Sequence, residues 1–266
     1  ELTALGLKGE ELKKVTADLK AGPKEGEEAG DVPTNKPSDQ ELQNQVGSVS
    51  LLGSHVIEGA VDPKLVLSYQ QASASEFFKD VVEVFDAMGT PPEGQERPPI
   101  KVLGGKTVTV NAGSYDLSGV YGGVETRAFM FAGVDKLTIA GNVAFRNENE
   151  AFDSAWEGLI LLSAGSVSLP KGTAEERASV SYGGDFIEVS SLDTLEVINV
   201  DLSAEGIVFV RSLDSLVINN ASMRTSGNGG PDFVHLRAFE EISADNLLFS
   251  DNMQRILMDA MTINLM

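Results

Sequence analysis

From residue 100 onward, this chain repeats a short hydrophobic phrase, and the repeat constrains the fold more than any other feature. The clearest copies are residues 186–197 and 207–218, each with a strand pattern, a short corner and a second strand pattern. Looser copies occupy residues 129–139, 159–169 and 233–244. A repeat at a fixed structural phase is typical of stacked units that bury their apolar sides against one another. The sequence therefore predicts a solenoid.

The copies align on a column of apolar residues, one from the start of each second strand. This column consists of Val108, Leu137, Val167, Leu195, Leu216, Ile242 and Met261. Successive members lie roughly 20 to 30 residues apart, as in solenoids that accept loop insertions on one face. We therefore expect about seven rungs whose strands keep a fixed phase while the connecting loops vary.

Two kinds of solenoid fit this repeat. Residues 213–223 match the opening of a leucine-rich repeat, which continues with Asn or Cys and returns through a helix. The position for that Asn or Cys holds Val200, Ala221 or Leu247, and the returns are rich in Gly, Ser and Asn. A further strand pattern, such as residues 186–189, also precedes each stretch that matches a leucine-rich repeat. We predict an all-β fold with a right-handed parallel β-helix over residues 100–266, and a leucine-rich-repeat-like solenoid as the alternative.

Asparagines recur after the second strand of several copies. Asn199, Asn220 and Asn246 occupy equivalent places, whereas Asn142 and Asn264 lie one place off this column. Stacked Asn side chains at a corner bond to one another and to backbone groups. We therefore predict an imperfect Asn ladder along one corner; the alternative is that Asn is simply common in turns.

The chain preceding the repeat divides into two regions. Residues 1–45 form a polar arm or linker with a short helix, and residues 46–99 contain short strands, a helix at about residues 73–88 and a Pro-rich connector. Ser73 or Ser75 is the expected N-cap of that helix. The open ends of a solenoid need covers, so we expect this helix to cap the N-terminal end. No cap follows residues 256–266, so we expect the C-terminal end to be uncapped.

Composition narrows the possible partners. Forty acidic and 20 basic residues give a formal net charge of −20 at pH 7, which disfavours nucleic acid and anionic lipid partners. The chain has no cysteine, which excludes disulfides, thiolate metal sites and cysteine nucleophiles. No apolar run of about 18 residues is present, so we expect no transmembrane segment. The chain begins at Glu1, as we expect of a processed or trimmed chain.

The repeat over about residues 100–266 resembles that of right-handed parallel β-helix proteins, a group that includes pectin-lyase-like enzymes, autotransporter passengers and filamentous adhesins. The resemblance implies either polysaccharide cleavage or a structural role. The hydrolases of this group use Asp clusters in Asn-Thr-Asp, Asp-Asp and Gly-His-Gly contexts with a later Arg-Ile-Lys, and the chain contains none of these strings. The lyases use an Arg or Lys base, but Arg211, Arg224, Arg237 and Arg255 fall in no common column of the alignment.

Acidic residues provide the nearest candidate for chemistry. Asp193, Asp214 and Glu240 share one column at a corner, where stacked carboxylates can bind Ca²⁺. Like charges about 4.8 Å apart repel, so a solvated corner is the alternative. We assign no catalytic residue, no cofactor and no other metal site.

Aromatic and histidine side chains are few. Tyr115, Tyr121 and Trp156 lie in or near Gly-rich loops and are the candidate glycan contacts. His55 and His235 are the only histidines, too few for a zinc site without carboxylates. We expect both histidines to be structural or solvent-facing.

We therefore expect a non-enzymatic structural or adhesive protein, extracellular or at the cell surface, which forms an acidic scaffold or filament subunit. Its partner is expected to be itself or another surface protein, with a glycan as a further candidate. In the sharper form of this hypothesis, the arm or cap of one copy covers the end of the next by strand addition. The expected assembly residues are Met258, Met261, Ile263 and Leu265. The alternatives are a β-helix polysaccharide lyase or hydrolase, or a glycan-binding module.

Overall fold

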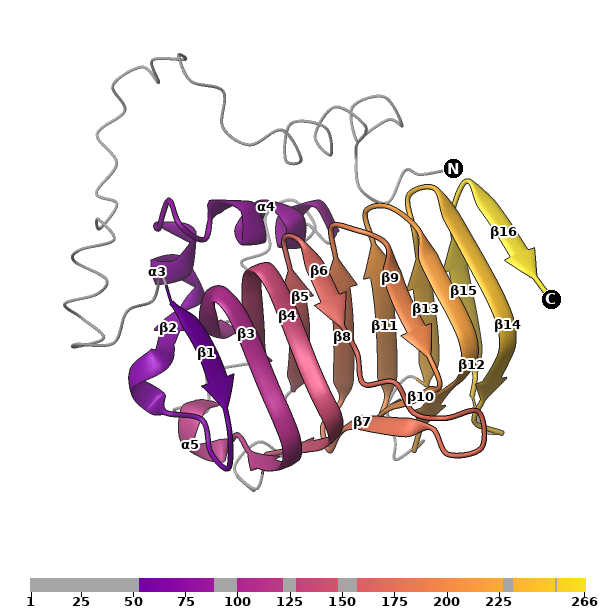
Figure 1. Cartoon of the computed structure of the whole chain (residues 1–266), viewed down its shortest axis with the longest axis horizontal. Helices are drawn as coiled ribbons and strands as arrows, with labels where there is room; N and C mark the ends of the chain where they lie inside the picture. Colours follow the sequence, from indigo (N-terminus) through magenta and orange to yellow (C-terminus); the bar gives the residue numbers. More distant parts are fainter. Residues whose placement is uncertain (1–52, 89–99, 122–127, 148–156, 227–231, 252) are drawn as a thin grey trace, which may run out of the picture.

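The computed structural model describes residues 53–88, 100–121, 128–147, 157–226, 232–251 and 253–266. The expected arm (residues 1–45) and the Pro-rich connector lie outside the described residues. The described strands join into one continuous sheet. This sheet winds along the long axis of the molecule and places β1 and β16 at opposite ends (Figure 1). The protein is a β-solenoid.

Each full turn of the solenoid contributes strands to three faces. The first face contains residues 100–105 of β3 (Ile100–Asp116), residues 128–133 of β4 (Ala128–Arg146), β5 (Gly158–Ser163), β8 (Phe186–Ser191), β11 (Ile207–Ser212), β13 (Phe233–Arg237) and β15 (Arg255–Asp259). The second face contains β1 (Ser54–Ile57), the middle parts of β3 and β4, β6 (Ser166–Ser168), β9 (Leu195–Ile198), the first parts of β12 (Leu216–Thr225) and β14 (Glu241–Phe249), and β16 (Thr262–Leu265). The third face contains the last parts of β3, β4, β12 and β14 together with β7 (Ala178–Tyr182) and β10 (Val200–Ala204).

Parallel pairing holds consecutive turns in register and stacks like side chains in columns. On the first face, Leu161 pairs with Val189, Val189 with Val210, and Val210 with Leu236. All four side chains are 0% exposed and belong to one core enclosed by the three faces. Because successive side chains of a strand alternate between its two sides, a slip by one residue would turn this column outward. The inward columns therefore fix the register.

The expected second-strand column is correct except at its last member. Val108 pairs with Leu137, and Leu137 pairs with Val167. Leu216 pairs with Leu195 on one side and with Ile242 on the other. Ile242 then pairs with Ile263 rather than with Met261, because Met261 lies in the corner before β16. The alternative of a leucine-rich-repeat-like solenoid is wrong: the described returns contain strands such as β7 and β10 in place of helices.

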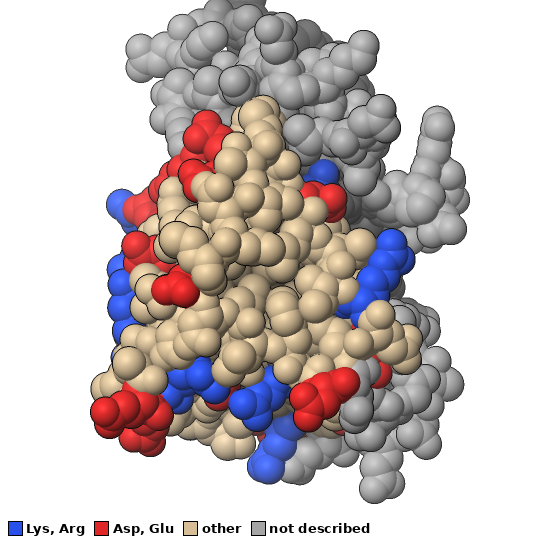
Figure 2. All heavy atoms as spheres, turned by 90° about the vertical axis from the view of Figure 1, so that its right-hand side faces the viewer, with Lys and Arg blue, Asp and Glu red and all other residues tan. Residues whose placement is uncertain are grey.

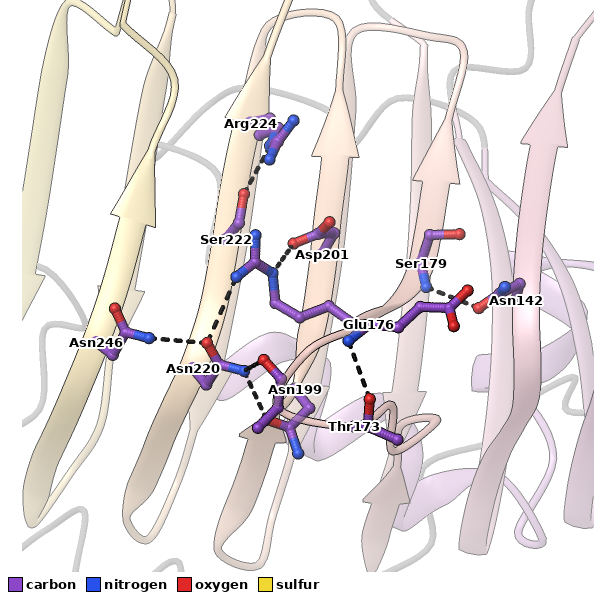
Figure 3. Close-up of polar contacts among 12 residues, drawn as sticks. Asn142, Thr173, Glu176, Ser179, Asn199, Asp201, Asn220, Ser222, Arg224 and Asn246 are labelled. Atoms are coloured by element: carbon purple, nitrogen blue, oxygen red, sulfur yellow. Dashed lines mark hydrogen bonds and ion pairs between the residues drawn. The ribbon is translucent and has the colours of Figure 1, made fainter.

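The predicted Asn ladder is confirmed at the corner between the second and third faces (Figure 3). Asn199, Asn220 and Asn246 have φ values of 53°, 47° and 48°, in the left-handed region that Asn tolerates better than most residues. The Asn246 side-chain amide donates to Asn220 Oδ1, and the Asn220 amide donates to Asn199 Oδ1, both at 2.8 Å. The Asn199 amide continues the line to the carbonyl oxygen of Gly172. The asparagines thus adopt the left-handed backbone conformation at each corner, and their side chains link consecutive turns of the solenoid.

The two asparagines outside this column make different contacts, as their shifted positions predicted. Asn142 Oδ1 accepts a hydrogen bond from the backbone N–H of Ser179 at 3.0 Å, across neighbouring turns (Figure 3). The Asn264 amide donates to Glu241 on the second face. Both side chains join adjacent turns without entering the ladder.

The helical segment before the repeat lies beside the solenoid rather than across its end. It consists of α3 (Tyr69–Ser73) and α4 (Lys79–Met88), and α4 contacts β4 and β5. Phe78 is 1% exposed and packs onto the first face at Gly104, where an added Cβ would stand 2.3 Å from the Phe78 ring. Ser75 Oγ accepts from the N–H of Phe77, and Ser73 ends α3. The expectation of one continuous capping helix at residues 73–88 is therefore corrected.

Strands and short helices occupy the N-terminal end of the described fold. β1 extends the second face by pairing parallel with β3, and β2 (Val66–Ser68) pairs antiparallel with β3 on the first face. The 3₁₀ helix η2 (Pro63–Leu65) connects toward β2, and α5 (Ser118–Tyr121) lies at the same end of the solenoid as β1 (Figure 1). β1 is thus the outermost strand of the second face at this end among the described residues.

Replacing Asn220 tests the ladder. Asn220→Ala removes the ladder hydrogen bonds to Asn199 and Asn246 and places a side chain with a left-handed penalty at this corner, so the free energy of unfolding should fall by about 2–4 kcal/mol. Asn220→Gly keeps the backbone conformation and should cost only about 1–2 kcal/mol. The control is Asn219→Ala, at the exposed neighbouring residue, which should change the free energy of unfolding by less than about 0.5 kcal/mol. Urea unfolding measures all three, and equal losses for Asn220→Ala and Asn219→Ala would contradict the ladder's role.

Candidate functional site

The C-terminal end of the solenoid combines open strand edges with exposed apolar side chains. β15 and β16 come last in the order of the sheet, so each pairs on one side only within the described residues. Ile256, Met261, Ile263 and Leu265 are 44%, 51%, 41% and 63% exposed, and we call these four residues the tail surface. Figure 2 views this end, where uncharged atoms fill the centre and most acidic and basic side chains lie around the edge.

The tail surface belongs to the last turn of the solenoid that the structure describes. Ile256 pairs in register with Val234, and Ile263 pairs with Ile242. Val234 and Ile242 are 0% exposed because the following turn covers them. Ile256 and Ile263 continue the same inward columns, but within the described residues no further turn lies over them. Their side chains point in the same direction as the core residues of these columns but are exposed to solvent.

Three of the four expected assembly residues belong to the tail surface. Met261, Ile263 and Leu265 lie there, whereas Met258 is half-buried and packs against the core. The expected set omitted Ile256. Its signal was present in the sequence, since Ile256 occupies the place that Val234 holds in the preceding copy.

All but one of the exposed large apolar side chains of the described solenoid lie toward its C-terminal end. The complete set is Val56, Leu248, Ile256, Met261, Ile263, Leu265 and Met266. Val56 is 64% exposed and lies on β1, at the end opposite to the tail surface (Figure 1). The other six lie between β14 and residue 266. Exposed apolar patches of this kind mark interaction surfaces more often than single scattered residues do.

The acidic column does not form a three-ligand metal site. Asp193, Asp214 and Glu240 lie at the corner between the first and second faces, as expected. Asp214 Oδ2 accepts a hydrogen bond from Thr194 Oγ1 at 2.8 Å. Across the described part of the chain, no group of three or more His, Cys, Asp or Glu side chains is placed to hold a metal ion. The corner therefore gives no support for a Ca²⁺ site.

The same corner contains a serine column that the sequence analysis missed. Ser163, Ser191 and Ser212 are at most 2% exposed. Ser191 Oγ donates to the carbonyl oxygen of Gly165, and Ser212 Oγ donates to that of Asp193, both at 2.9 Å to the preceding turn. The signal was the Ser that precedes Leu-Asp in both clear copies of the phrase. These hydroxyls satisfy backbone groups at the corner, so their role is structural.

The expected glycan contacts are not on the surface. Tyr115 and Tyr121 are 1% and 0% exposed. The Tyr115 hydroxyl donates to the carbonyl oxygen of Ile57, and the Tyr121 hydroxyl lies 2.7 Å from that of Tyr182. Burial raises the pKa of the Tyr121 hydroxyl well above its usual value. Trp156 lies outside the described residues. The prediction that Tyr115 and Tyr121 contact a glycan is therefore wrong, because both are buried and their hydroxyls have hydrogen-bond partners inside the core.

The outer surface of the first face changes character along the solenoid. One outward column begins with Val102, Met130 and Ile160, which pack under α3 and α4, and continues with Glu188, Phe209, His235 and Leu257. Phe209 of this column contacts two rings of the adjacent column: its ring lies 6.0 Å from the Phe186 ring and 5.7 Å from the Phe233 ring, nearly perpendicular to both. The surface is thus apolar beneath the helices and aromatic and charged beyond them.

Ion pairs connect neighbouring strands on this aromatic and charged part. Arg211 Nη1 lies 3.3 Å from Glu188 Oε1, which also accepts from Ser190 Oγ at 2.7 Å. The side chains of Arg211 and Glu188 are 13% and 7% exposed, and the Arg211 guanidinium lies over the Phe209 ring at 4.3 Å. Pairs this deeply buried are costly to break, because removal of one partner leaves a charge without compensation.

The four arginines share no common column, as expected, but two of them do pair. Arg211 on β11 pairs in register with Arg237 on β13. Burial and, second, the charge of Arg211 lower the pKa of the Arg237 guanidinium. An arginine remains protonated in proteins, so two positive charges lie side by side on adjacent strands.

The histidines lie apart and in different settings. His55 lies in β1, and burial lowers its pKa. His235 lies on the outer surface of the first face, where its Nε2 is 2.8 Å from Asp259 Oδ2. Burial lowers the pKa of His235 more than the hydrogen bond to Asp259 raises it, which favours the neutral ring near pH 7. The expectation of structural histidines remains a prediction.

Comparisons of this chain with protein-family models, curated proteins and solved structures find no match. Among the described helices, none has the length and apolar character needed to cross a membrane. The geometry of the chain itself is therefore the basis for a functional proposal.

Replacing Glu188 tests the buried ion pair. Glu188→Gln leaves Arg211 beside Arg237 without its carboxylate, so the free energy of unfolding should fall by about 2–4 kcal/mol. Adding Arg211→Met to that variant should recover part of the loss. Glu196→Gln is the matched control, because the Lys171–Glu196 pair is 62% and 52% exposed and should contribute less than about 1 kcal/mol. If both single variants lost equally little in urea unfolding, Glu188 would not be the group that compensates Arg211.

Proposed function

We propose that this chain is a non-enzymatic structural subunit, extracellular or at a cell surface, that assembles end to end into filaments. The observation that carries the proposal is the tail surface, where core-directed apolar side chains lie exposed on strands with open edges. We further propose that the solenoid is a right-handed parallel β-helix, since connections between parallel strands of one sheet are right-handed in nearly all proteins.

A second copy of the same chain fits the tail surface. β1 at the opposite end is also an outermost strand of the second face, and it runs parallel to β3 as β16 runs parallel to β14. Stacking β16 of one copy against β1 of the next therefore continues the second face with every strand parallel. Backbone hydrogen bonds would extend across the junction, as in other cases of strand addition.

The edge strand lacks the features by which monomeric proteins block such pairing. Natural edges carry charges, Pro or bulges that prevent another strand from adding. Residues 260–266 contain no charged residue and no Pro. The rim of the same end is charged, which favours solubility while leaving the centre open (Figure 2).

The predicted contact joins two different surfaces, which determines the form of the assembly. β16 and the tail surface belong to one end, whereas β1 and Val56 belong to the other (Figure 1). A contact between unlike surfaces repeats indefinitely unless a rotation closes it into a ring. Because the ends lie along the solenoid axis, we expect straight polar filaments. The net charge of −20 should limit their lateral aggregation.

Charges placed on β16 test the proposal. Ile263→Lys combined with Leu265→Lys would force two ammonium groups into the junction, so association should weaken at least about 100-fold. Both side chains are more than a third exposed in the single chain, so the fold should persist. Thr262→Lys adds charge on the outward side of the same strand and serves as the control. Sedimentation velocity over a concentration series measures association, and circular dichroism checks the fold.

Two results would contradict the assembly. The first is an unmodified chain that stays monomeric at the highest attainable concentration. The second is assembly that Ile263→Lys with Leu265→Lys leaves unchanged, since the contact would then lie elsewhere.

A further inference from the structure

The outer surface of the first face contains a buried arginine that lacks the kind of partner its neighbours have. Arg237 is 8% exposed. Within the described parts of the chain, it makes no hydrogen bond and no ion pair. A charge taken out of water is costly unless another group compensates it. Arg237 is therefore a candidate for binding a ligand on this surface.

The register of the strands shows why Arg237 differs. Two diagonal contacts cross neighbouring strands on either side of it: Glu188 to Arg211, and His235 to Asp259. Arg237 occupies the equivalent diagonal position, but the residue there is Phe209. A ring takes the place that a carboxylate or imidazole fills in the other two diagonals. The Arg237 guanidinium therefore has no diagonal partner of this kind.

The acidic residue that pairs in register with Arg237 already contacts another side chain. Asp259 pairs in register with Arg237, and its charge favours the protonated guanidinium. Its Oδ2, however, lies 2.8 Å from His235 Nε2, and its side chain is 55% exposed. The carboxylate therefore interacts with Arg237 at a distance and mostly through solvent, which weakens the attraction.

We propose that Arg237, with Arg211 beside it, binds a small oxyanion. A guanidinium presents N–H groups in a planar fork that matches the oxygens of carboxylate, sulfate and phosphate. Arg211 and Arg237 stand on paired strands, about 4.8 Å apart along the face, so both forks can approach one anion. Phe209 and Phe233 provide an apolar wall beside them, where low polarity strengthens each charge-assisted bond. The site lies on the outer side of the solenoid and is independent of end-to-end assembly.

Nuclear magnetic resonance of the arginine side chains tests the site directly. The full chain, labelled at arginine, is titrated with sodium sulfate, phosphate or acetate against sodium chloride at equal ionic strength. The Nε–Hε signals of Arg237 and Arg211 should shift together along one saturable curve with at least one of these oxyanions. The acetate arm separates a carboxylate preference from a tetrahedral one. Shifts that follow ionic strength alone, with no saturation, would overturn the proposal.

Variants place the binding at Arg237. Arg237→Gln should weaken the anion at least ~10-fold. Arg224→Gln removes the same charge from an exposed position on the third face and should leave binding unchanged. Asp259→Asn should tighten binding, because the competing negative charge is gone. Equal weakening by Arg237→Gln and Arg224→Gln would show a general charge effect and overturn the site.

A further variant covers the case in which Arg237→Gln does not fold. Arg237→Lys keeps the charge and loses the fork, so it should bind several-fold more weakly than the unmodified chain. Equal affinity of the Lys variant and the unmodified chain would contradict recognition by the guanidinium. The titration of the unmodified chain needs no variant and remains decisive by itself.

Discussion

The in-register stacking of parallel turns is the constraint on which the rest of this structure depends. Each turn must return to the same three corners, or its inward side chains would lose their column. Two devices enforce this return: columns such as Leu161, Val189, Val210 and Leu236, and the Asn ladder at one corner. The ladder supplies both the left-handed backbone turn and a side-chain bond to the next turn. Local conformation and long-range pairing are thus satisfied by the same residues.

The functional proposal rests on the two ends of the described solenoid. In the interior, Val234 and Ile242 are covered by the next turn, whereas Ile256 and Ile263 in the same columns are exposed. In the proposed assembly, a second copy covers Ile263 on the second face, where β1 runs parallel to its neighbour as the strands of the stack do, whereas β2 on the first face is antiparallel. The side of the solenoid is different: there, α3 and α4 cover the apolar part and leave charged groups such as Arg211 and Arg237 outside.

The sequence predicted features that depend on local period and failed where distant contacts decide. The solenoid, the strand columns and the ladder of Asn199, Asn220 and Asn246 follow from the repeat, because a column shares one phase in every copy. The loop tyrosines were expected to contact a glycan, yet Tyr115 is buried and its hydroxyl donates to the distant carbonyl oxygen of Ile57. The pairing of Arg211 with Arg237 required the true register across a variable loop. The placement of α4 depends on the contact between Phe78 and Gly104 on the first face. The sequence of the helical segment does not specify this contact.

The central claim, that copies join head to tail in register, is tested most directly by disulfide trapping. Continuing the second-face columns across the junction places Asn264 of one copy beside Val56 of the next. The chain has no cysteine, so Val56→Cys and Asn264→Cys together introduce the only two thiols. Paired parallel strands bring Cα atoms about 4.8 Å apart, within the range for a disulfide. Under mild oxidation the double variant should form a ladder of covalent multimers, while a mixture of the two single variants should form mixed dimers. Dimers between two copies of the Asn264→Cys variant alone, or no cross-linking at all, would contradict the account.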